Sequence, residues 1–198
     1  MKSSMIRIAV LAGLLCAVAL IIVSLGKGIA PSTGSVQAAS AAEVYCGQSG
    51  GEPVRRIPVY GTNGSDPLPL SGARMFCGFH ASDGSRIHIL VDTLYTQRPT
   101  LAALAYYAQV PPQSGCQGNP ASCYCTQLGG SDLFGGINAA GGGWVNEQTV
   151  DQTLEACIFP DMSSIDSWGL FYYSAGIIRG KDLSTVLRYP NPYKTKRR

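Results

Sequence analysis

Hydrophobic residues follow two different patterns along this chain. Residues 8–25 form one apolar run, and no charged residue lies between Arg7 and Lys27. A run preceded by Lys2 and Arg7 predicts a secretory signal or a retained membrane anchor, and this run is just long enough to span a bilayer. The small residues at 36–38, VQA, offer a cleavage site. Both interpretations stay open for residues 1–38, and both place the rest of the chain outside the cytoplasm.

After residue 38 the apolar positions occur in short segments with helical spacing. The segment after Ser40 has Glu43 three residues on, a capping box, and the segment after Asn119 has Pro120 at the first helical position. Each segment ends near a glycine pair that suits a helix C-terminus. Two later helices are expected after Thr100 and Asp182. Their apolar stripes are Leu101, Leu104 and Ala108 in the first, and Leu183, Val186 and Leu187 in the second.

Between these helices the pattern is that of short strands. Ile87 and Ile89 share a face after the turn sequence ASDGS, and Ile165 shares one with Ser167 or Trp168 after PDMSS. Alternation that follows turn residues predicts antiparallel strands joined by tight turns.

The chain also contains an internal repeat. VYCGQSGG at 44–51 matches CYCTQLGG at 123–130, and the segment from Cys77 matches the segment from Cys157 at nearly the same spacing. We interpret this as a tandem duplication with units at 39–110 and 111–190 and a basic tail at 191–198. The predicted fold class is α+β, with two tandem disulfide-stapled units, each a short helix, a small antiparallel sheet and a second short helix. We expect the units to dock through their apolar strand faces.

The repeat also predicts the disulfides. One of the seven cysteines, Cys16, lies in the leader, and an even number in an exported region predicts three bridges. Equivalent positions in the two copies pair Cys46 with Cys77 and Cys125 with Cys157. On the chain-entropy model each loop of this length contributes about 3.7 kcal/mol. Cys116 and Cys123 are both absent from the first copy, which favours a third bridge between them over a redox Cys-x-Cys site.

The charge of the exported region excludes one class of partner. The formal charge of +3 includes Lys2, Arg7 and Lys27, so residues 39–198 carry 12 basic and 12 acidic side chains. Four of those basic residues lie in the tail, KTKRR. The body is therefore slightly acidic, which argues against nucleic-acid binding.

Chemistry-bearing motifs are scarce. His80 and His88 are the two histidines. One interpretation is a metal site that they form with Asp83, and the stronger interpretation is that His80 is a turn residue. No nucleophile elbow, haem motif or phosphate loop occurs, so we expect no catalytic residue, metal or cofactor. Trp168, Phe171, Tyr172 and Tyr173 form an aromatic cluster, which is either a core strand or a partner-binding face. The binding candidates are Trp168, Phe171, Tyr173 and Asp161.

The second copy resembles a known family. NPASCYCTQLGG, CIFPDMSSID and SWGLFYY, within residues 118–173, are similar to a small exported bacterial domain, domain of unknown function 333, often labelled a hemolysin. Residues 39–95 resemble a degraded version, and Met162 stands where that family usually has glycine. The resemblance implies no established activity. The exported segments lack the membrane-inserting strands or apolar helix of a pore former.

These observations predict an exported binding or interaction module without catalysis. Its partner is expected to be a protein or another envelope component, and it contacts the membrane only through residues 8–25 if these are retained. The alternative is a small disulfide-stabilised protease inhibitor that presents the turn at 160–164. An enzyme is a third and weaker hypothesis.

Overall fold

The structure is a computed structural model that describes residues 38–132, 140–146 and 153–194. Residues 39–198 form one compact unit. The predicted signal or anchor lies outside the described residues, as does nearly all of the basic tail. Within the described ranges no helix has the length and apolar character needed to cross a bilayer.

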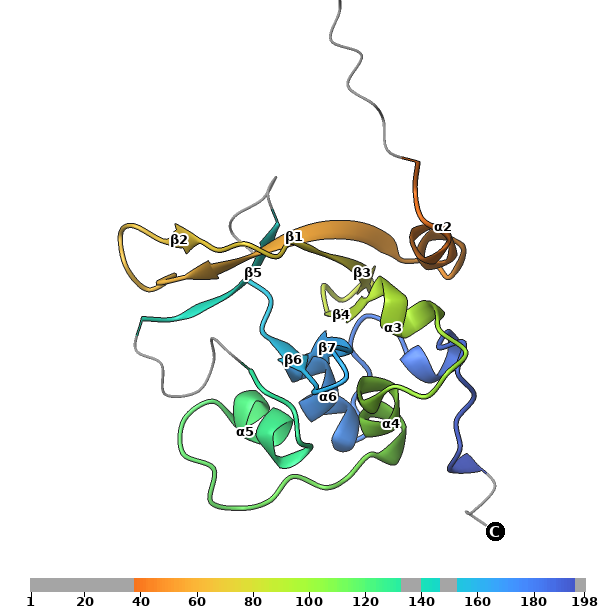
Figure 1. The fold of residues 1–198 in the computed structure, drawn as a ribbon. Coiled ribbons are helices and arrows are strands. Elements are labelled where there is room, and N and C mark those ends of the chain that lie inside the picture. The colour runs from red at the N-terminus through yellow and green to blue at the C-terminus, as the bar shows by residue number, and fades with distance from the viewer. Residues whose placement is uncertain (1–37, 133–139, 147–152, 195–198) are drawn as a thin grey trace, which may run out of the picture. The chain divides into compact units, whose positions relative to one another are not determined.

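The described elements confirm the α+β class, with helices on an antiparallel sheet (Figure 1). The first half contains α2 (Ala41–Gln48), β1 (Glu52–Tyr60), β2 (Leu68–Pro69), β3 (Arg74–His80), β4 (Arg86–Leu90), α3 (Val91–Tyr95) and α4 (Leu101–Ala108). The second half contains α5 (Pro120–Gln127), β5 (Gly142–Asn146), β6 (Ala156–Ile158), β7 (Ser164–Asp166), α6 (Ser167–Ser174) and the 3₁₀ turn η1 (Leu183–Thr185).

The sheet runs through both halves and returns toward its own edge. Its strand order is β2-β1-β3-β4-β7-β6, and β5 also pairs with β1. Trp144 of β5 pairs with Leu154, two residues before β6 begins. Ladder pairing therefore continues from β1 through β5 to the segment that enters β6, so the inner face of the sheet is enclosed.

The two halves join through backbone pairing rather than through stacked strand faces. Ile89 in β4 lies opposite Ile165 in β7. Both predicted units thus belong to one sheet and one compact body.

The repeat is visible in the local geometry of each half. The N–H of Gly51 donates to the Cys46 carbonyl, and the N–H of Gly130 donates to the Cys125 carbonyl, both at 3.0 Å. Cys77 lies opposite Ile89 in one hairpin, and Cys157 lies opposite Ile165 in the other. Because Ile89 and Ile165 are equivalent and also pair with each other, the halves are related by an approximate two-fold axis beside this pair.

The hairpins differ in length more than the sequence comparison indicates. The span from Cys77 to Ile89 exceeds the span from Cys157 to Ile165 by four residues, two on each strand. The sequence comparison indicates only nearly the same spacing. The longer first hairpin carries His80 and Arg86 beyond the end of its counterpart.

The helix starts follow their predicted caps. The side chain of Ser40 accepts from the Glu43 N–H, and that of Asn119 accepts from the Ala121 and Ser122 N–H groups. Thr100 accepts from Ala103 at the start of α4. After Asp182, which accepts from Ser184, a 3₁₀ turn stands where a helix was expected.

Residues 167–174 form helix α6, so the core-strand interpretation of Trp168, Phe171, Tyr172 and Tyr173 is wrong. The carboxylate of Asp166 accepts from the Gly169 N–H at 2.9 Å and caps the new helix. The strand therefore ends at Asp166 and the helix begins at once.

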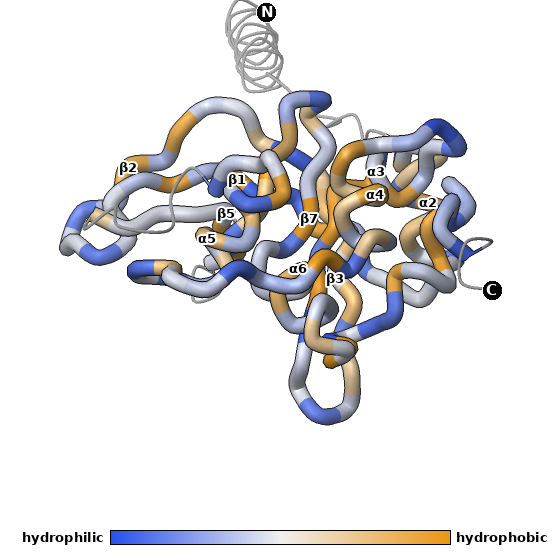
Figure 2. Tube along the Cα trace, turned by 90° about the horizontal axis from the view of Figure 1, so that it is seen from below, coloured by the Kyte–Doolittle hydropathy of each residue, from blue (hydrophilic) through white to orange (hydrophobic). Residues whose placement is uncertain are grey.

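Alternate strand residues face two separate cores, as period-two alternation requires. One face meets the helices and includes Cys77, Phe79, Ile87, Ile89, Cys157 and Ile165. The enclosed face holds Phe76, Leu90, Trp144, Leu154 and Ala156. Figure 2 shows hydrophobic positions concentrated where strands and helices meet.

Candidate functional site

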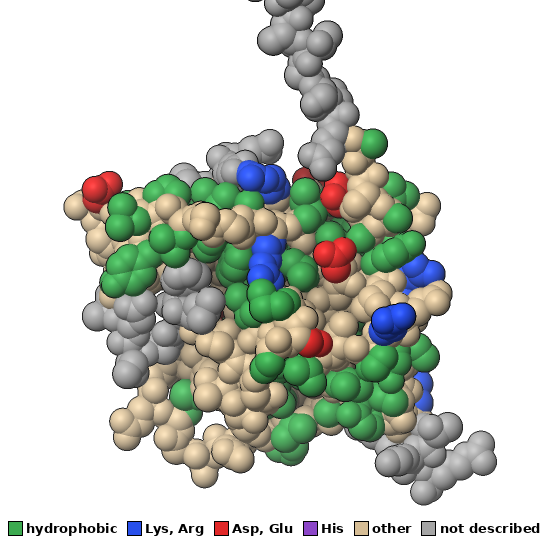
Figure 3. All heavy atoms as spheres, in the orientation of Figure 1, with side chains coloured by type: hydrophobic (Ala, Val, Ile, Leu, Met, Phe, Trp, Pro, Cys, Tyr) green, Lys and Arg blue, Asp and Glu red, His purple; other side chains and the backbone are tan. Residues whose placement is uncertain are grey.

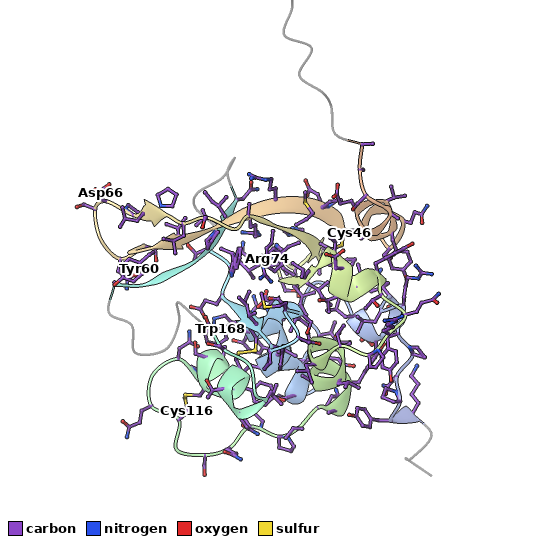
Figure 4. All side chains as sticks on the ribbon, in the orientation of Figure 1. Cys46, Tyr60, Asp66, Arg74, Cys116 and Trp168 are labelled. Carbon is purple, nitrogen blue, oxygen red and sulfur yellow. A yellow bond between two sulfur atoms is a disulfide. The ribbon has the colours of Figure 1, made fainter. Side chains whose placement is uncertain are left out.

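The three predicted disulfides form. Cys46 is bonded to Cys77, Cys116 to Cys123, and Cys125 to Cys157. All four cysteines of the two long-range bridges are fully buried, whereas Cys116 is exposed on the loop before α5 (Figure 4). Three disulfides in one small protein indicate an oxidising, extracytoplasmic environment.

Of the four predicted binding residues, Trp168 and Phe171 are in edge-on contact, with ring centroids 6.1 Å apart, but the four do not form one site. Phe171 packs edge-on against Tyr124, and Tyr173 stacks on Tyr106 with ring centroids 3.8 Å apart. Asp161 lies in the turn between β6 and β7. Trp168 alone lines a cleft that contains unpaired charges, described below.

The turn with Asp161 caps helix α4 of the other half. Asp161 Oδ2 accepts from the Leu101 N–H at 2.8 Å, and Ser163 Oγ accepts from the Ala102 N–H at 3.0 Å. Partial burial opposes ionisation of Asp161, but bonds from Ser163 and Leu101 outweigh it and lower the pKa of Asp161. The polar side chains of this turn are thus committed to a helix terminus.

Met162 occupies the left-handed region in this turn, with φ 64°. Its side chain is 55% exposed. Gly84, with φ 81°, occupies the corresponding place in the longer hairpin. The structure thus explains why a glycine suits this position.

A charged network lies inside the enclosed face of the sheet. It contains Arg56 from β1, His88 from β4 and Asp166 from β7, all nearly inaccessible to solvent. Arg56 Nη2 lies 3.1 Å from His88 Nε2, and His88 Nδ1 lies 3.7 Å from Asp166 Oδ2. Gly78 makes room for the imidazole, because a Cβ there would lie 3.1 Å from His88 Cδ2 and Nε2.

The contact with Arg56 fixes the protonation of His88. A guanidinium can only donate, so Nε2 accepts and the proton of the neutral ring sits on Nδ1, facing Asp166. Burial, assisted by Arg56 and Arg86, lowers the pKa of His88 despite the opposing effect of Asp166. Burial also lowers the pKa of Arg56, to about 10, which leaves it charged at neutral pH.

A cleft of about 390 Å³ lies over this network, and we call it the Arg179 cleft. Its lining residues are Arg86, Thr153, Leu154, Glu155, Asp166, Trp168, Tyr172 and Arg179. The α6 side chains Trp168 and Tyr172 form an aromatic wall, with ring centroids 5.8 Å apart and planes inclined by 30°.

Two arginines of the Arg179 cleft have no carboxylate partner among the described residues. The Arg179 guanidinium lies 4.9 Å from the centre of the Tyr172 ring, and its Nε is buried without a hydrogen-bond partner there. Arg86 likewise makes no ion pair within the described ranges.

The carboxylates of the Arg179 cleft are held by the protein. Glu155 Oε2 accepts from Asn119 Nδ2 at 2.7 Å. Burial raises the pKa of Glu155, and the bonds from Asn119 and Trp168 oppose this rise. Asp166 caps α6 and faces His88. These acids therefore fix the walls of the cleft, whereas the arginines remain available.

A second cleft, of about 560 Å³, is the two-fold counterpart of the first, and we call it the Arg74 cleft. Six of its residues correspond to residues of the Arg179 cleft through the Cys77–Cys157 and Ile89–Ile165 equivalences. The matched pairs are Ala73/Thr153, Arg74/Leu154, Met75/Glu155, Leu90/Asp166, Asp92/Trp168 and Thr96/Tyr172.

The Arg74 cleft differs in chemistry from its counterpart. Its arginine donates to the Met162 carbonyl at 3.2 Å and lies 5.7 Å from the Trp144 ring centre, so it is already engaged. Figure 3 shows hydrophobic side chains around a basic one at the middle of this face, where Figure 4 labels Arg74. A third cleft beside the Cys116–Cys123 bridge is lined largely by polar and proline residues.

The described residues contain no cluster of three or more histidine, cysteine or carboxylate groups able to hold a metal ion. His80 contacts the His88 ring edge-on at 5.9 Å, but Asp83 instead accepts from the Ser85 N–H at 2.8 Å. The considered histidine–Asp83 grouping is therefore not assembled.

Sequence reasoning missed Arg56, Arg86 and Arg179. A signal existed for Arg86, because it alternates with Ile87 and shares the enclosed face with His88. Nothing local marked Arg179, which lies after α6 and reaches the cleft only through the tertiary fold.

Comparison with known proteins finds no match, whether among protein-family models, curated proteins or solved structures.

Proposed function

We propose that this protein is an exported binding module without catalysis and that it holds a small ligand in the Arg179 cleft. The compartment follows from the three disulfides. The proposal includes residues 8–25 as a signal or a membrane anchor. It also includes membership of the second half in the hemolysin-labelled family. The partner that delivers or carries the ligand is an envelope component or protein.

One observation carries the proposal: Arg86 and Arg179 stand without carboxylate partners, among the described residues, at a cleft walled by Trp168 and Tyr172. A concave site with an aromatic wall and a few convergent polar groups is typical of small-molecule binding. The enclosed Arg56–His88–Asp166 network adjoins the cleft through Asp166, which lines it.

The same network does not suggest catalysis. His88 is fully buried, and its ring faces Arg56 and Asp166 rather than a nucleophile. A general base must reach a substrate proton directly or through one water. The network instead places His88 beside Asp166, whose carboxylate caps α6.

The protease-inhibitor alternative gains no support from the turn at 160–164. Asp161 and Ser163 are bonded to the N-terminus of α4, whereas Pro160 and Met162 are exposed. An inhibitory loop must offer its backbone and side chains to a protease, and here both of those polar side chains are engaged within the protein.

Ligand-detected NMR tests the proposal. The full exported protein is screened against small carboxylates, phosphates, sugars, amines and neutral aromatics, and binding is followed at the Trp168 indole N–H. That signal is assigned with Trp144→Phe, since the chain has two tryptophans. We expect at least one chemical class to produce a saturable shift.

Two variants locate the binding. Trp168→Ala should abolish ligand-observed saturation transfer, whereas Tyr60→Ala, at an exposed position on β1, should preserve it. If no class binds at millimolar concentration, or if Trp168→Ala leaves binding intact, the proposal is wrong.

A further inference from the structure

We infer, on the premise of the proposed function, that the ligand of the Arg179 cleft is a monocarboxylate that carries one ring. Arg86 and Arg179 would receive the carboxylate, and the wall of Trp168 and Tyr172 would receive the face of the ring.

The first argument is the presentation of Arg179. Its guanidinium Cζ lies 4.9 Å from the centre of the Tyr172 ring, a cation–π contact that holds the group at the cleft. A guanidinium carries its N–H groups in a planar fork, from which a planar carboxylate can accept two parallel bonds. The Tyr172 contact therefore places Arg179 at the cleft before the ligand arrives.

The second argument is the charge balance. Glu155 and Asp166 line the cleft beside Arg86 and Arg179. Two more carboxylates lie near, because Asp132 acts on Glu155 and Asp83 acts on Arg179. A ligand with one negative charge is repelled less by these carboxylates than a phosphate dianion.

The third argument concerns the ring. Trp168 and Tyr172 lie on successive turns of α6, with ring planes inclined by 30°, and they give one side of the cleft an aromatic surface. Both an aromatic ring and the apolar face of a pyranose can pack on such a surface. The shared chemistry is therefore a flat ring with one carboxylate, and the source is decided by experiment.

The fourth argument is size. A volume of about 390 Å³ lies near the lower end of ligand pockets, which range over about 300–1,000 Å³. One ring with a short acid chain suits this volume. The Arg74 cleft lacks the free arginine pair, since its arginine is bonded to the Met162 carbonyl. One ligand per chain is therefore expected.

Calorimetric titration of the full exported protein tests the inference. Phenylacetate and glucuronate are the carboxylate probes, 2-phenylethanol and glucose are their neutral counterparts, and phenyl phosphate is the dianion. We expect one carboxylate to bind at one equivalent, at least tenfold more tightly than its neutral counterpart and more tightly than phenyl phosphate.

Variants test the assigned groups. Arg179→Lys, which keeps the charge but loses the planar fork, should weaken the preferred carboxylate about tenfold, and Arg86→Gln should weaken it similarly. Arg98→Gln, at an exposed position outside the cleft, serves as control and should leave affinity unchanged. Circular dichroism verifies that each variant is folded.

The outcomes separate this inference from its premise. If neutral or phosphate probes bind at Trp168 as tightly as the carboxylates, or no carboxylate binds while another class does, the ligand class is wrong and the binding module stands. If no probe of any class binds, both fail. Because the probe comparison uses the wild-type protein, it decides the matter even where a variant does not fold.

Discussion

The similarity of the two halves is tested most directly at the second glycine of each Gly-Gly pair, Gly51 and Gly130. A Cβ built on Gly51 would lie 2.4 Å from Cys77 Sγ and 2.8 Å from Phe79 Cε1. A Cβ on Gly130 would lie 2.4 Å from Cys157 Sγ and 2.9 Å from Cys125 Sγ. Each glycine therefore stands directly against the buried disulfide of its own half.

The expected cost is steric rather than conformational. Neither glycine has a positive φ, so the backbone itself accepts alanine. Ordinary contacts between heavy atoms lie near 3.5–4.0 Å, so a Cβ at 2.4 Å overlaps by more than 1 Å. The sulfur cannot rotate away because the bridge holds it. Overpacking of this kind costs about 1–3 kcal/mol.

Urea unfolding of the oxidised protein, followed by far-UV circular dichroism, measures this cost. Gly51→Ala and Gly130→Ala should each lower the free energy of unfolding by about 1–3 kcal/mol. Gly47→Ala is the matched control, since it lies within α2 and its Cβ would meet nothing within 4 Å. It should raise the free energy of unfolding by about 0.5–1 kcal/mol.

A double-mutant cycle isolates the contact. When Cys125 and Cys157 are both replaced by alanine, the cost of Gly130→Ala should largely disappear, because the obstructing sulfur atoms are gone. If Gly130→Ala or Gly51→Ala matches the stability of the wild type in the oxidised protein, the described packing of glycine against disulfide is refuted.

Three further predictions concern the turn, the buried histidine and the exposed bridge. Met162→Gly should raise the free energy of unfolding in urea by about 0.5–1 kcal/mol, because relief of the left-handed strain exceeds the entropy cost of glycine. Because burial lowers the pKa of His88, this side chain binds a proton below about pH 6.5 in the unfolded chain but not in the native state. The free energy of unfolding should therefore decrease as the pH is lowered below about 6.5, with a limiting slope of about 1.4 kcal/mol per pH unit. Urea titrations at successive pH values measure this slope, and His88→Gln should remove it. Mild reductant should open Cys116–Cys123 first in peptide mapping, since Cys116 is exposed, and its seven-residue span should contribute about 2.5 kcal/mol against about 3.7 for each buried bridge.

Local features of the fold could be predicted because local residues determine them. Ser40, Thr100 and Asn119 cap helices through bonds to N–H groups two or three residues away. The disulfide pairing followed from the nearly equal spacing of Cys46–Cys77 and Cys125–Cys157, and it needed no knowledge of the tertiary structure.

Features that depend on tertiary contacts escaped prediction. The sequence of α6 is apolar almost throughout, so no polar face distinguished a helix from a buried strand. The start of α6 depends on Asp166, whose place is set by pairing of β7 with β4 and β6. Arg86 and Arg179 come together only because the halves share one sheet, and no local pattern connects them.

The comparison of the two clefts indicates how two similar halves come to differ at a site. The approximate two-fold axis places a depression at equivalent points, yet Trp168 corresponds to Asp92 and Leu154 corresponds to Arg74. Arg86 lies in the part of the first hairpin that its shorter counterpart lacks. Tyr172 lies on α6, whereas the matching Thr96 lies just beyond the end of the shorter α3.

The Arg179 cleft is therefore built from differences between the halves, not from what they share. The shared parts, namely the capped helices, the buried bridges and the Ile89–Ile165 pair, hold the sheet in place. A site made from unshared parts is free to specialise without disturbing that frame. On this argument, exchange of cleft residues such as Arg179 should alter binding while leaving the free energy of unfolding nearly unchanged, whereas exchange of Gly130 should do the reverse.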